Sequence, residues 1–254
     1  MAGDWDGGFG AIGPGWQLYV GAVGEAAEHA HHAIQIVLAD SPIVLRDAAG
    51  RQHPSTAALI PANMPHAIVS GSGRAAMLYL EPESTTGRAL GARFTGDTDA
   101  VGTWAEAARD LSPALLTPGA EPDALVTTVL DALGLTGPHN PVHPAVERAI
   151  RHLPTVLDGP VRLAEVAAVA GLSASRLSHL FADEIGLSFR RYVLWLRLRR
   201  AVESVLGGAT LTEAAHAAGF TDSAHLTNVT RRTFGLAPSR LAKAVAPVAR
   251  DRAR

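Results

Sequence analysis

Three histidines in the amino-terminal part of the chain have the residue type and spacing of a metal or ligand site. His29 and His31 are two positions apart, and His66 follows later in the chain. Alternate residues of a β-strand point to the same side of a sheet, so one strand would present His29 and His31 together, with His66 on a neighbouring strand. Three converging imidazoles can hold a divalent ion such as Zn²⁺ or Ni²⁺, or line a pocket for a small molecule.

The residues around these histidines resemble the two sequence motifs of the cupin barrels. The chain reads His29-x-His31-x-x-x-Gln35 and later Pro61-x-Asn63-x-x-His66, where the cupin pattern is His-x-His-x-x-x-Glu and Pro-x-Gly-x-x-His. The resemblance implies a β-barrel whose pocket contains His29, His31, Gln35 and His66. Gln35 replaces the usual carboxylate and argues against a cupin metalloenzyme, while a pocket without metal and a bound divalent ion both stay open. His32 would point to the opposite face and is expected at the surface or at an interface.

A second set of candidate residues lies in a repeat in the carboxyl-terminal half. A Leu, Ala and Gly pattern occurs twice, forty-eight positions apart, and each copy reads as a short helix, a glycine turn and a second helix. Small alanines let two helices approach closely, and the glycines relieve the steric cost of a sharp exit from the first helix. The repeated positions are Leu163, Ala167 and Gly171, then Leu211, Ala215 and Gly219.

The second helix of each copy has an apolar face and a polar one. Helical periodicity turns the leucines and other apolar residues inward and leaves hydrogen-bonding and cationic side chains on the outside, where they can enter a DNA major groove. The candidate DNA-binding residues are Ser175, Arg176, Ser178 and His179 in the first copy, and Ser223, Ala224, His225, Thr227, Asn228, Arg231 and Arg232 in the second.

Residues 143–241 resemble the tandem helix-turn-helix domain of the AraC/XylS transcription regulators. The resemblance rests on the first repeat, on a central arginine-bearing helix at 192–206, and on the closing Phe234-Gly235-x-x-Pro238 motif. It implies seven helices, with two recognition helices that read successive major grooves of double-stranded DNA. Asn228 stands where the family often has Arg, which favours adenine over guanine as the contacted base. Thr230 stands where a Phe is usual, so we expect looser packing in the second copy.

The charge distribution agrees with a DNA-binding carboxyl-terminal half. The formal net charge of the chain is only −2, but residues 1–137 contain six Arg, no Lys and fifteen Asp plus Glu, a net charge of −9. Residues 138–254 contain fifteen Arg, one Lys and nine Asp plus Glu, a net charge of +7. Such asymmetry indicates a part that binds a polyanion joined to an acidic part that binds something else.

Composition and pattern place these residues on a two-domain, α+β chain. Its 254 residues suit two domains, its hydrophobic content of 47% excludes a disordered chain, and the absence of cysteine excludes disulfides and thiolate metal sites. We expect a cupin-like sensor barrel at 1–87, a helical connector and dimerisation segment at 88–137, and the tandem helix-turn-helix domain at 138–254. Strands are expected at 17–20, 33–38, 43–45, 57–60, 67–69 and 75–80, helices at 104–111 and 123–133, and a linker around 134–141. The glycines Gly7, Gly8 and Gly10 are expected in turns.

The sequence therefore predicts a cytoplasmic, sequence-specific DNA-binding transcription regulator, and not an enzyme. Its partners would be a DNA operator, a small-molecule or metal effector in the barrel, and a second copy of the chain in a homodimer, with no membrane. A constitutive DNA-binding protein whose barrel only dimerises it is the main alternative. A regulator that transfers alkyl groups to itself would need a nucleophilic cysteine, which the chain lacks.

Overall fold

The structure is a computed structural model that describes residues 5–13, 15–135 and 142–246. Its packing divides the chain into two compact units. The first comprises residues 1–137, 206–208 and 230–254, and the second comprises 138–205 and 209–229. The chain therefore changes unit several times, the last time between Val229 and Thr230. The domain limits expected from the sequence stay predictions.

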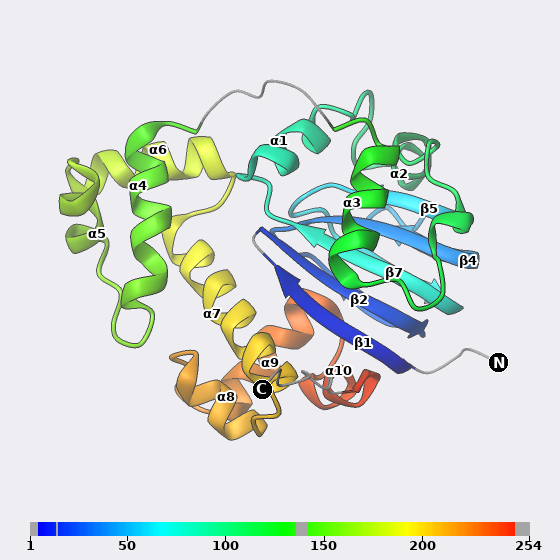
Figure 1. Cartoon of the computed structure of the whole chain (residues 1–254). Coiled ribbons are helices and arrows are strands. Elements are labelled where there is room, and N and C mark those ends of the chain that lie inside the picture. Colours follow the sequence, from blue (N-terminus) through cyan, green and yellow to red (C-terminus); the bar gives the residue numbers. More distant parts are fainter. Residues whose placement is uncertain (1–4, 14, 136–141, 247–254) are drawn as a thin grey trace. The chain divides into compact units, whose positions relative to one another are not determined.

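Eight strands of the first unit form one sheet with the order β3-β6-β4-β7-β2-β1-β8, and β5 pairs with β4. All pairings are antiparallel except that of β1 with β8. The long strand β4 pairs with β5 along one edge, and along the other with β7 in its first part and β6 in its last part. It thus belongs to two branches of a half-barrel (Figure 1). The strands are β1 (Asp6–Gly13), β2 (Trp16–Val23), β3 (Ala26–His29), β4 (Ile34–Asp47), β5 (Gln52–Ile60), β6 (His66–Ser70), β7 (Ser72–Leu80) and β8 (Val245–Ala246).

The two faces of the sheet carry separate apolar cores because side chains alternate along each strand. Ile36 and Leu38 contribute to one core, whereas Val37 between them contributes to the other. Gln35 and Tyr79 are paired across β4 and β7. Gln35 is two positions before Val37, so the two side chains point to the same face of the sheet. The polar residues of the histidine site therefore lie on the face that also carries the buried Trp104.

Three short helices follow the strands in the first unit, namely α1 (Thr85–Gly91), α2 (Val101–Ala107) and α3 (Pro122–Ala132), with a 3₁₀ turn η1 (Pro113–Leu115). Helix α3 lies across the sheet over β2 and β7 (Figure 1), and its apolar stripe of Leu125, Val126 and Val129 is buried in the core on that face. The apolar stripe of the helix expected in the connector therefore packs against the sheet of the same chain.

Helix α2 is tied to the sheet by one buried carboxylate. Asp47 ends β4 and accepts hydrogen bonds from the backbone N–H of Ala49, Arg51 and Val101 and from the Arg51 side chain. Burial alone would raise the pKa of Asp47, but the hydrogen bonds from Val101 and Arg51 hold it below its usual range. This carboxylate therefore fixes both the β4–β5 hairpin and the start of α2.

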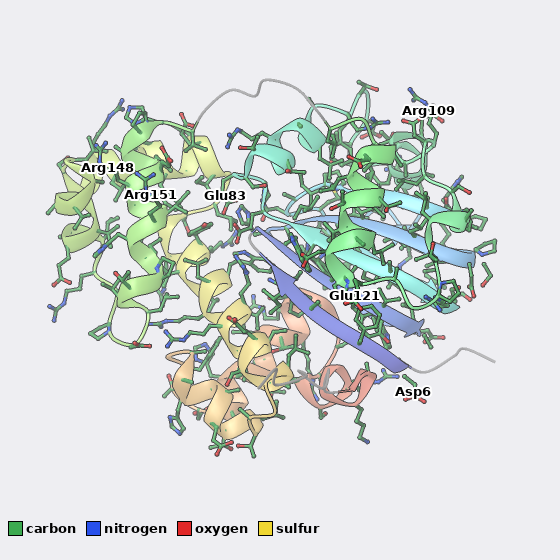
Figure 2. The ribbon with its side chains drawn as sticks, viewed as in Figure 1. Asp6, Glu83, Arg109, Glu121, Arg148 and Arg151 are labelled. Atoms are coloured by element: carbon green, nitrogen blue, oxygen red, sulfur yellow. The ribbon has the colours of Figure 1, made fainter. Side chains whose placement is uncertain are left out.

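The described residues 142–246 of the carboxyl-terminal part contain seven α-helices. They are α4 (Pro144–His152), α5 (Leu163–Ala170), α6 (Ala174–Ile185), α7 (Phe189–Leu206), α8 (Leu211–Ala217), α9 (Ser223–Phe234) and α10 (Pro238–Ala244), with a 3₁₀ turn η2 (Leu153–Val156) after α4. Gly171 ends α5 with a φ of 74°, and Gly219 after α8 has the same φ. Both repeat glycines therefore adopt the left-handed conformation that glycine permits. Arg148 and Arg151 project from α4 (Figure 2).

The strands and helices differ from expectation in a few places. Residues 34–38 and 43–45 belong to one strand, β4, and the helix expected at 104–111 begins earlier, at Val101. Gly7, Gly8 and Gly10 lie in β1, so the prediction of turns there is wrong. Most of the expected linker, 136–141, lies outside the described residues. Among the residues that the structure describes, no helix combines the length and apolar character needed to cross a membrane.

Candidate functional site

The structure brings His29, His31 and His66 together from three segments. His29 ends β3 and is paired with His66 at the start of β6, while His31 lies in the connection to β4. One ring nitrogen from each histidine lies within 4.8 Å of the other two. His31 is thus not on the same strand as His29, but its imidazole reaches the same cluster.

In all three imidazoles, Nδ1 is hydrogen-bonded to a backbone carbonyl. Nδ1 of His29 donates to the carbonyl of Ala27 (2.7 Å), Nδ1 of His31 to Ala33 (2.8 Å) and Nδ1 of His66 to Met64 (2.9 Å). A neutral imidazole has a single N–H, so each Nε2 carries a lone pair. The backbone therefore sets the tautomer in which Nε2 is the free ligand atom.

Burial keeps these imidazoles neutral. Burial lowers the pKa of His29 to about 3, with the neighbouring His31 adding to the effect. Burial also lowers the pKa of His31, and it holds the pKa of His66 well below the usual range, with His29 and His31 adding to the effect. Neutral imidazole is the form that binds metal ions.

Gln35 lies at the centre of the cluster. Its Oε1 is 3.0 Å from Nε2 of His31 and 3.1 Å from Nε2 of His66. Its amide nitrogen is directed to the sulfur of Met77 (3.2 Å) and to the hydroxyl of Tyr79 (3.5 Å). Burial raises the pKa of Tyr79, so the phenol is neutral. Gln35 is 2% exposed.

Asn63 shapes the turn that leads to His66. Its φ is 61°, in the left-handed region where the cupin pattern has glycine, and asparagine is among the residues that adopt this conformation most readily. Its backbone N–H donates to the carbonyl of His31 (2.7 Å). The departure from glycine therefore leaves the turn intact and ties it to the segment of His31.

The imidazole nitrogens of the cluster suit a divalent cation of intermediate softness, such as Zn²⁺. Nitrogen ligands of one tetrahedral zinc ion lie about 3.4 Å apart for bonds of about 2.1 Å, so the rings would have to tilt inward from their separation of up to 4.8 Å. The backbone acceptors on Nδ1 are the outer partners that ligating histidines usually have. The cluster contains no carboxylate, so it does not suit Mg²⁺ or Ca²⁺.

His32 is not a surface residue. It is 3% exposed, and its Nε2 lies 3.0 Å from Oε2 of Glu83, which is also buried. The expectation of a surface position for His32 is wrong, because His32 lies in the connection between β3 and β4, where strand alternation does not apply, and Glu83 covers it. The alternative of an interface position stays a prediction. Glu83 lies fifty-one positions away.

The first candidate reading helix, α6, presents the expected residues to solvent. Ser173 caps it by accepting from the backbone N–H of Arg176 (3.2 Å). Leu177, Leu180 and Phe181 are buried on its inner face. Ser175, Arg176 and His179 are exposed, and Ser178 is half-buried.

The second candidate reading helix, α9, is capped by Asp222, which accepts from the backbone N–H of His225 (2.7 Å). The ring of His225 lies edge-on to Phe220, with centroids 5.2 Å apart. The hydroxyl of Thr227 donates to the carbonyl of Ser223 (2.8 Å), so it can only accept from a base. Asn228 is exposed and can both donate and accept. Ala224, His225, Arg231 and Arg232 are also exposed, while Ser223 and Thr227 are half-buried.

The end of α9 forms part of the first unit, a feature that sequence reasoning missed. The ring of Phe234 lies 5.8 Å from that of Tyr79, and Tyr79 lies 5.1 Å from His31. A methyl group on Gly235 would come within 2.8 Å of Nδ1 of His29. Leu236 is 3% exposed and belongs to the same core as Trp104. The Phe-Gly motif was noted only as part of the helix-turn-helix pattern, and nothing in its spacing points to the histidines.

A second hollow in the first unit is too small to hold an organic effector. It lies between α3 and the sheet and has a volume of about 10 Å³, room for one water at most. Its lining is wholly apolar and consists of Leu18, Ile36, Leu38, Ala76, Leu78, Leu125, Val126 and Val129.

The fold and the paired reading helices define a class, a half-barrel followed by a tandem helix-turn-helix domain. Residues 166–244 match the family described as "Helix-turn-helix domain". The chain is also 30% identical over 100 residues to the HTH-type transcriptional regulator GlxA of Rhizobium meliloti. That match covers 39% of this chain and 31% of GlxA, so the chain spans about a third of this curated relative. The carboxyl-terminal part is thus a helix-turn-helix domain of the AraC type, which confirms the resemblance seen in the sequence.

Solved structures share the two-part fold. The apo structure of ToxT from Vibrio cholerae superposes with a TM-score of 0.61 at 10% identity, covering 92% of this chain and 99% of that one. ToxT bound to (E)-4-(8-methylnaphthalen-1-yl)but-3-enoic acid gives a TM-score of 0.57 at 13% identity, covering 92% and 100%. At these identities the likeness concerns the fold. It confirms the predicted order of an amino-terminal β-domain followed by a helical domain, and the sheet forms a half-barrel where a cupin-like barrel was expected.

Proposed function

We propose that the protein is a transcription regulator that binds double-stranded DNA in a sequence-specific manner, and that its half-barrel senses a small ligand or a metal ion. The observation that carries the proposal is the pair of capped helices, α6 and α9, each with an apolar inner face and an exposed polar face. Duplicated helix-turn-helix units with such faces are suited to reading two major-groove segments.

The charge and chemistry of the outer faces support this function. Arg176, Arg231 and Arg232 are exposed cations that can contact phosphates, which supply much of the affinity for DNA. His179 and Asn228 are exposed and carry groups that hydrogen-bond to base edges, each good contact being worth about 1 to 3 kcal/mol of discrimination. The net charge of residues 138–254 has the sign that DNA attracts.

The sensing role is supported by the buried polar cluster in the half-barrel. Imidazoles and an amide buried together are costly unless they are partnered, so such a cluster is a candidate binding site. The ToxT structures with a bound butenoic acid and with a bound unsaturated fatty acid support the idea that a fold of this kind can hold an effector. The printed name of GlxA, an HTH-type transcriptional regulator, supports the DNA-binding function and not the sensing role. Homodimer formation and a cytoplasmic location stay predictions.

Selection of binding sites from random duplexes tests the DNA-binding function. Full-length protein at moderate salt should enrich a preferred site, and Arg176→Ala should weaken binding to all duplexes alike because a phosphate contact is lost. The matched control is Arg109→Ala, which also removes one exposed arginine but just after α2 (Figure 2). No enrichment over competitor, or equal effects of the two variants, would count against the proposal. Unchanged affinity with every effector tried would favour a constitutive DNA-binding protein.

A further inference from the structure

An arginine accompanies each copy of the repeat in the tandem domain. Arg148 lies on α4, the helix that precedes the first copy, and Arg197 lies forty-nine positions later on α7, the helix that precedes the second copy. The two turn glycines, Gly171 and Gly219, are forty-eight positions apart, so the arginines keep step with the repeat. All four residues belong to the second unit. Each copy is therefore a set of three helices, α4 to α6 and α7 to α9, with an arginine on the first of them.

Arg148 stabilises its own copy. Its guanidinium donates to the carbonyl of Ala170 (2.7 Å), the last residue of α5. The last carbonyls of a helix have no partner within the helix, and a cation beside them is favourable. A methyl group on Gly171 would lie 3.7 Å from the same guanidinium, which is an ordinary contact. Arg148 thus holds the turn of the first copy and leaves room beside its glycine.

Arg197 instead bonds to the other copy. Its guanidinium donates to the carbonyl of Gly159 (2.9 Å), in the loop that leads into α5 of the first copy. The same guanidinium lies beside the turn of the second copy, since a methyl group on Gly219 would come within 3.1 Å of its Nε. The carbonyl oxygen of Leu157 would lie 2.9 Å from that methyl group. The first copy and the turn of the second therefore meet around one side chain.

A second arginine of α7 holds the same loop. Arg200 forms an ion pair with Asp158, with 2.5 Å between its guanidinium nitrogen and the carboxylate oxygen. The carboxylate of Asp158 is exposed to solvent, so this ion pair contributes little free energy by itself. The hydrogen bond of Arg197 is half-buried and has a charged donor, and such bonds are stronger. Of the two arginines, Arg197 therefore contributes more to the junction between the copies.

We propose that Arg197 is a positioning residue that sets the orientation of the second reading helix relative to the first, and hence the spacing between the two parts of the operator. This role rests on the proposed DNA-binding function. Helix α9 begins four residues after Gly219, so a rotation of this turn changes the direction of α9. One base pair corresponds to about 3.4 Å along the duplex and about a tenth of a turn around it. The junction at Arg197 therefore determines which spacing suits both helices.

Duplexes in which the two parts of the selected site are moved together or apart by one base pair test this role. Full-length wild-type protein should bind the selected spacing about tenfold more tightly than the others, because a wrong spacing removes the base contacts of one helix. Arg197→Met should bind all spacings with similar affinity. The matched control is Arg148→Met, which removes the equivalent arginine within the first copy and should weaken binding but keep the preferred spacing. Arg197→Lys retains a donor for Gly159 and should restore part of the preference.

A pair of glycine variants tests the same junction from its other side. Gly219→Ala and Gly171→Ala both place a side chain at a φ of 74°, so backbone strain is common to the two. Only Gly219→Ala brings a methyl group against Leu157 and Arg197. We expect Gly219→Ala to reduce the preference for the selected spacing and Gly171→Ala to keep it. Because this pair leaves Arg197 in place, it tests the role even when Arg197→Met does not fold.

The outcomes separate this role from the proposed function. Loss of the spacing preference in Arg197→Met and Gly219→Ala, with both controls keeping it, supports the role. A wild-type protein that selects a duplex but tolerates every spacing, or an Arg197→Met variant that keeps the wild-type preference, would overturn the role while the proposed function stands. Equal loss of the preference in Arg148→Met would also overturn it, because a general loss of stability would then explain both variants. A wild-type protein that prefers no duplex would overturn the proposed function, and the role with it.

Discussion

Acidification should destabilise the metal-free protein through its three buried histidines. In the folded chain the pKa of His29 is lowered to about 3, and those of His31 and His66 are also lowered, whereas the ordinary value is 6.5. The unfolded chain therefore takes up protons first as the pH falls through 6.5. Stability rises with pH wherever the unfolded state binds more protons, so the folded protein loses stability on acidification below about neutral pH. For His29 this window extends down to about pH 3.

The size of the effect follows from proton linkage. Between pH 7 and pH 5.5, protonation of one histidine in the unfolded chain costs the folded state about 1.3 kcal/mol. For His29 alone this is a sizeable part of the 5 to 15 kcal/mol that typically stabilises a domain. The lowered pKa values of His31 and His66 add to the loss in the same direction. None of the three is more than 6% exposed, so solvent screening should reduce this value little.

Urea unfolding at several pH values, with a chelator present, measures the slope directly. His66→Gln should lower the loss between pH 7 and pH 5.5, whatever its effect on stability at neutral pH. His179→Gln, which removes an exposed imidazole outside the cluster, is the matched control. A wild-type slope equal to that of His66→Gln would refute the reasoning, because His66 would then take up its proton as readily in the folded chain as in the unfolded one.

Three further predictions concern single side chains. Asn228→Arg should move the preferred base at one position of the selected site from adenine toward guanine, a change of about 1 to 3 kcal/mol that repeated site selection would reveal. Leu177→Ala removes a fully buried side chain of the first reading helix and should cost about 2 to 5 kcal/mol in urea unfolding. Asp47→Asn should cost about 1 to 3 kcal/mol at pH 7. Because the pKa of Asp47 is lowered on folding, this difference should persist above about pH 4 and shrink as acid protonates the wild-type carboxylate.

The sequence predicted the structure well wherever a local pattern of residues determines the backbone conformation. Alternating apolar residues located most strands of the half-barrel, and the repeated glycines located both turns of the tandem domain, since a left-handed residue after a helix strongly prefers glycine. The spacing of His29, His31 and His66 identified residues that the fold does bring together. Their convergence depends on pairing between β3 and β6, which restricts where each side chain can point.

Features that depend on distant packing could not be read in this way. Strand β1 is rich in glycine because it lies close to a neighbouring strand, and a methyl group on Gly8 would come within 2.4 Å of the Tyr19 ring. Local composition alone suggests a turn there. The burial of His32 depends on Glu83, far along the chain. In both cases the deciding partner is set by the tertiary fold and leaves no periodic signal in the sequence.

Gly235 shows how one residue can meet a local and a distant requirement at once. Its φ of 67° ends α9, as the φ of 73° at Gly186 ends α6, and this requirement is visible in the repeat. The close approach to Ala27 and His29 also excludes any side chain, and nothing in the repeat reveals it. The helix-turn-helix pattern alone would require glycine at both positions, so the pattern cannot show which glycine has the second role. Urea unfolding of Gly235→Ala and Gly186→Ala separates the roles: backbone strain is common to both variants, and the close approach to Ala27 and His29 should make Gly235→Ala the more destabilising one.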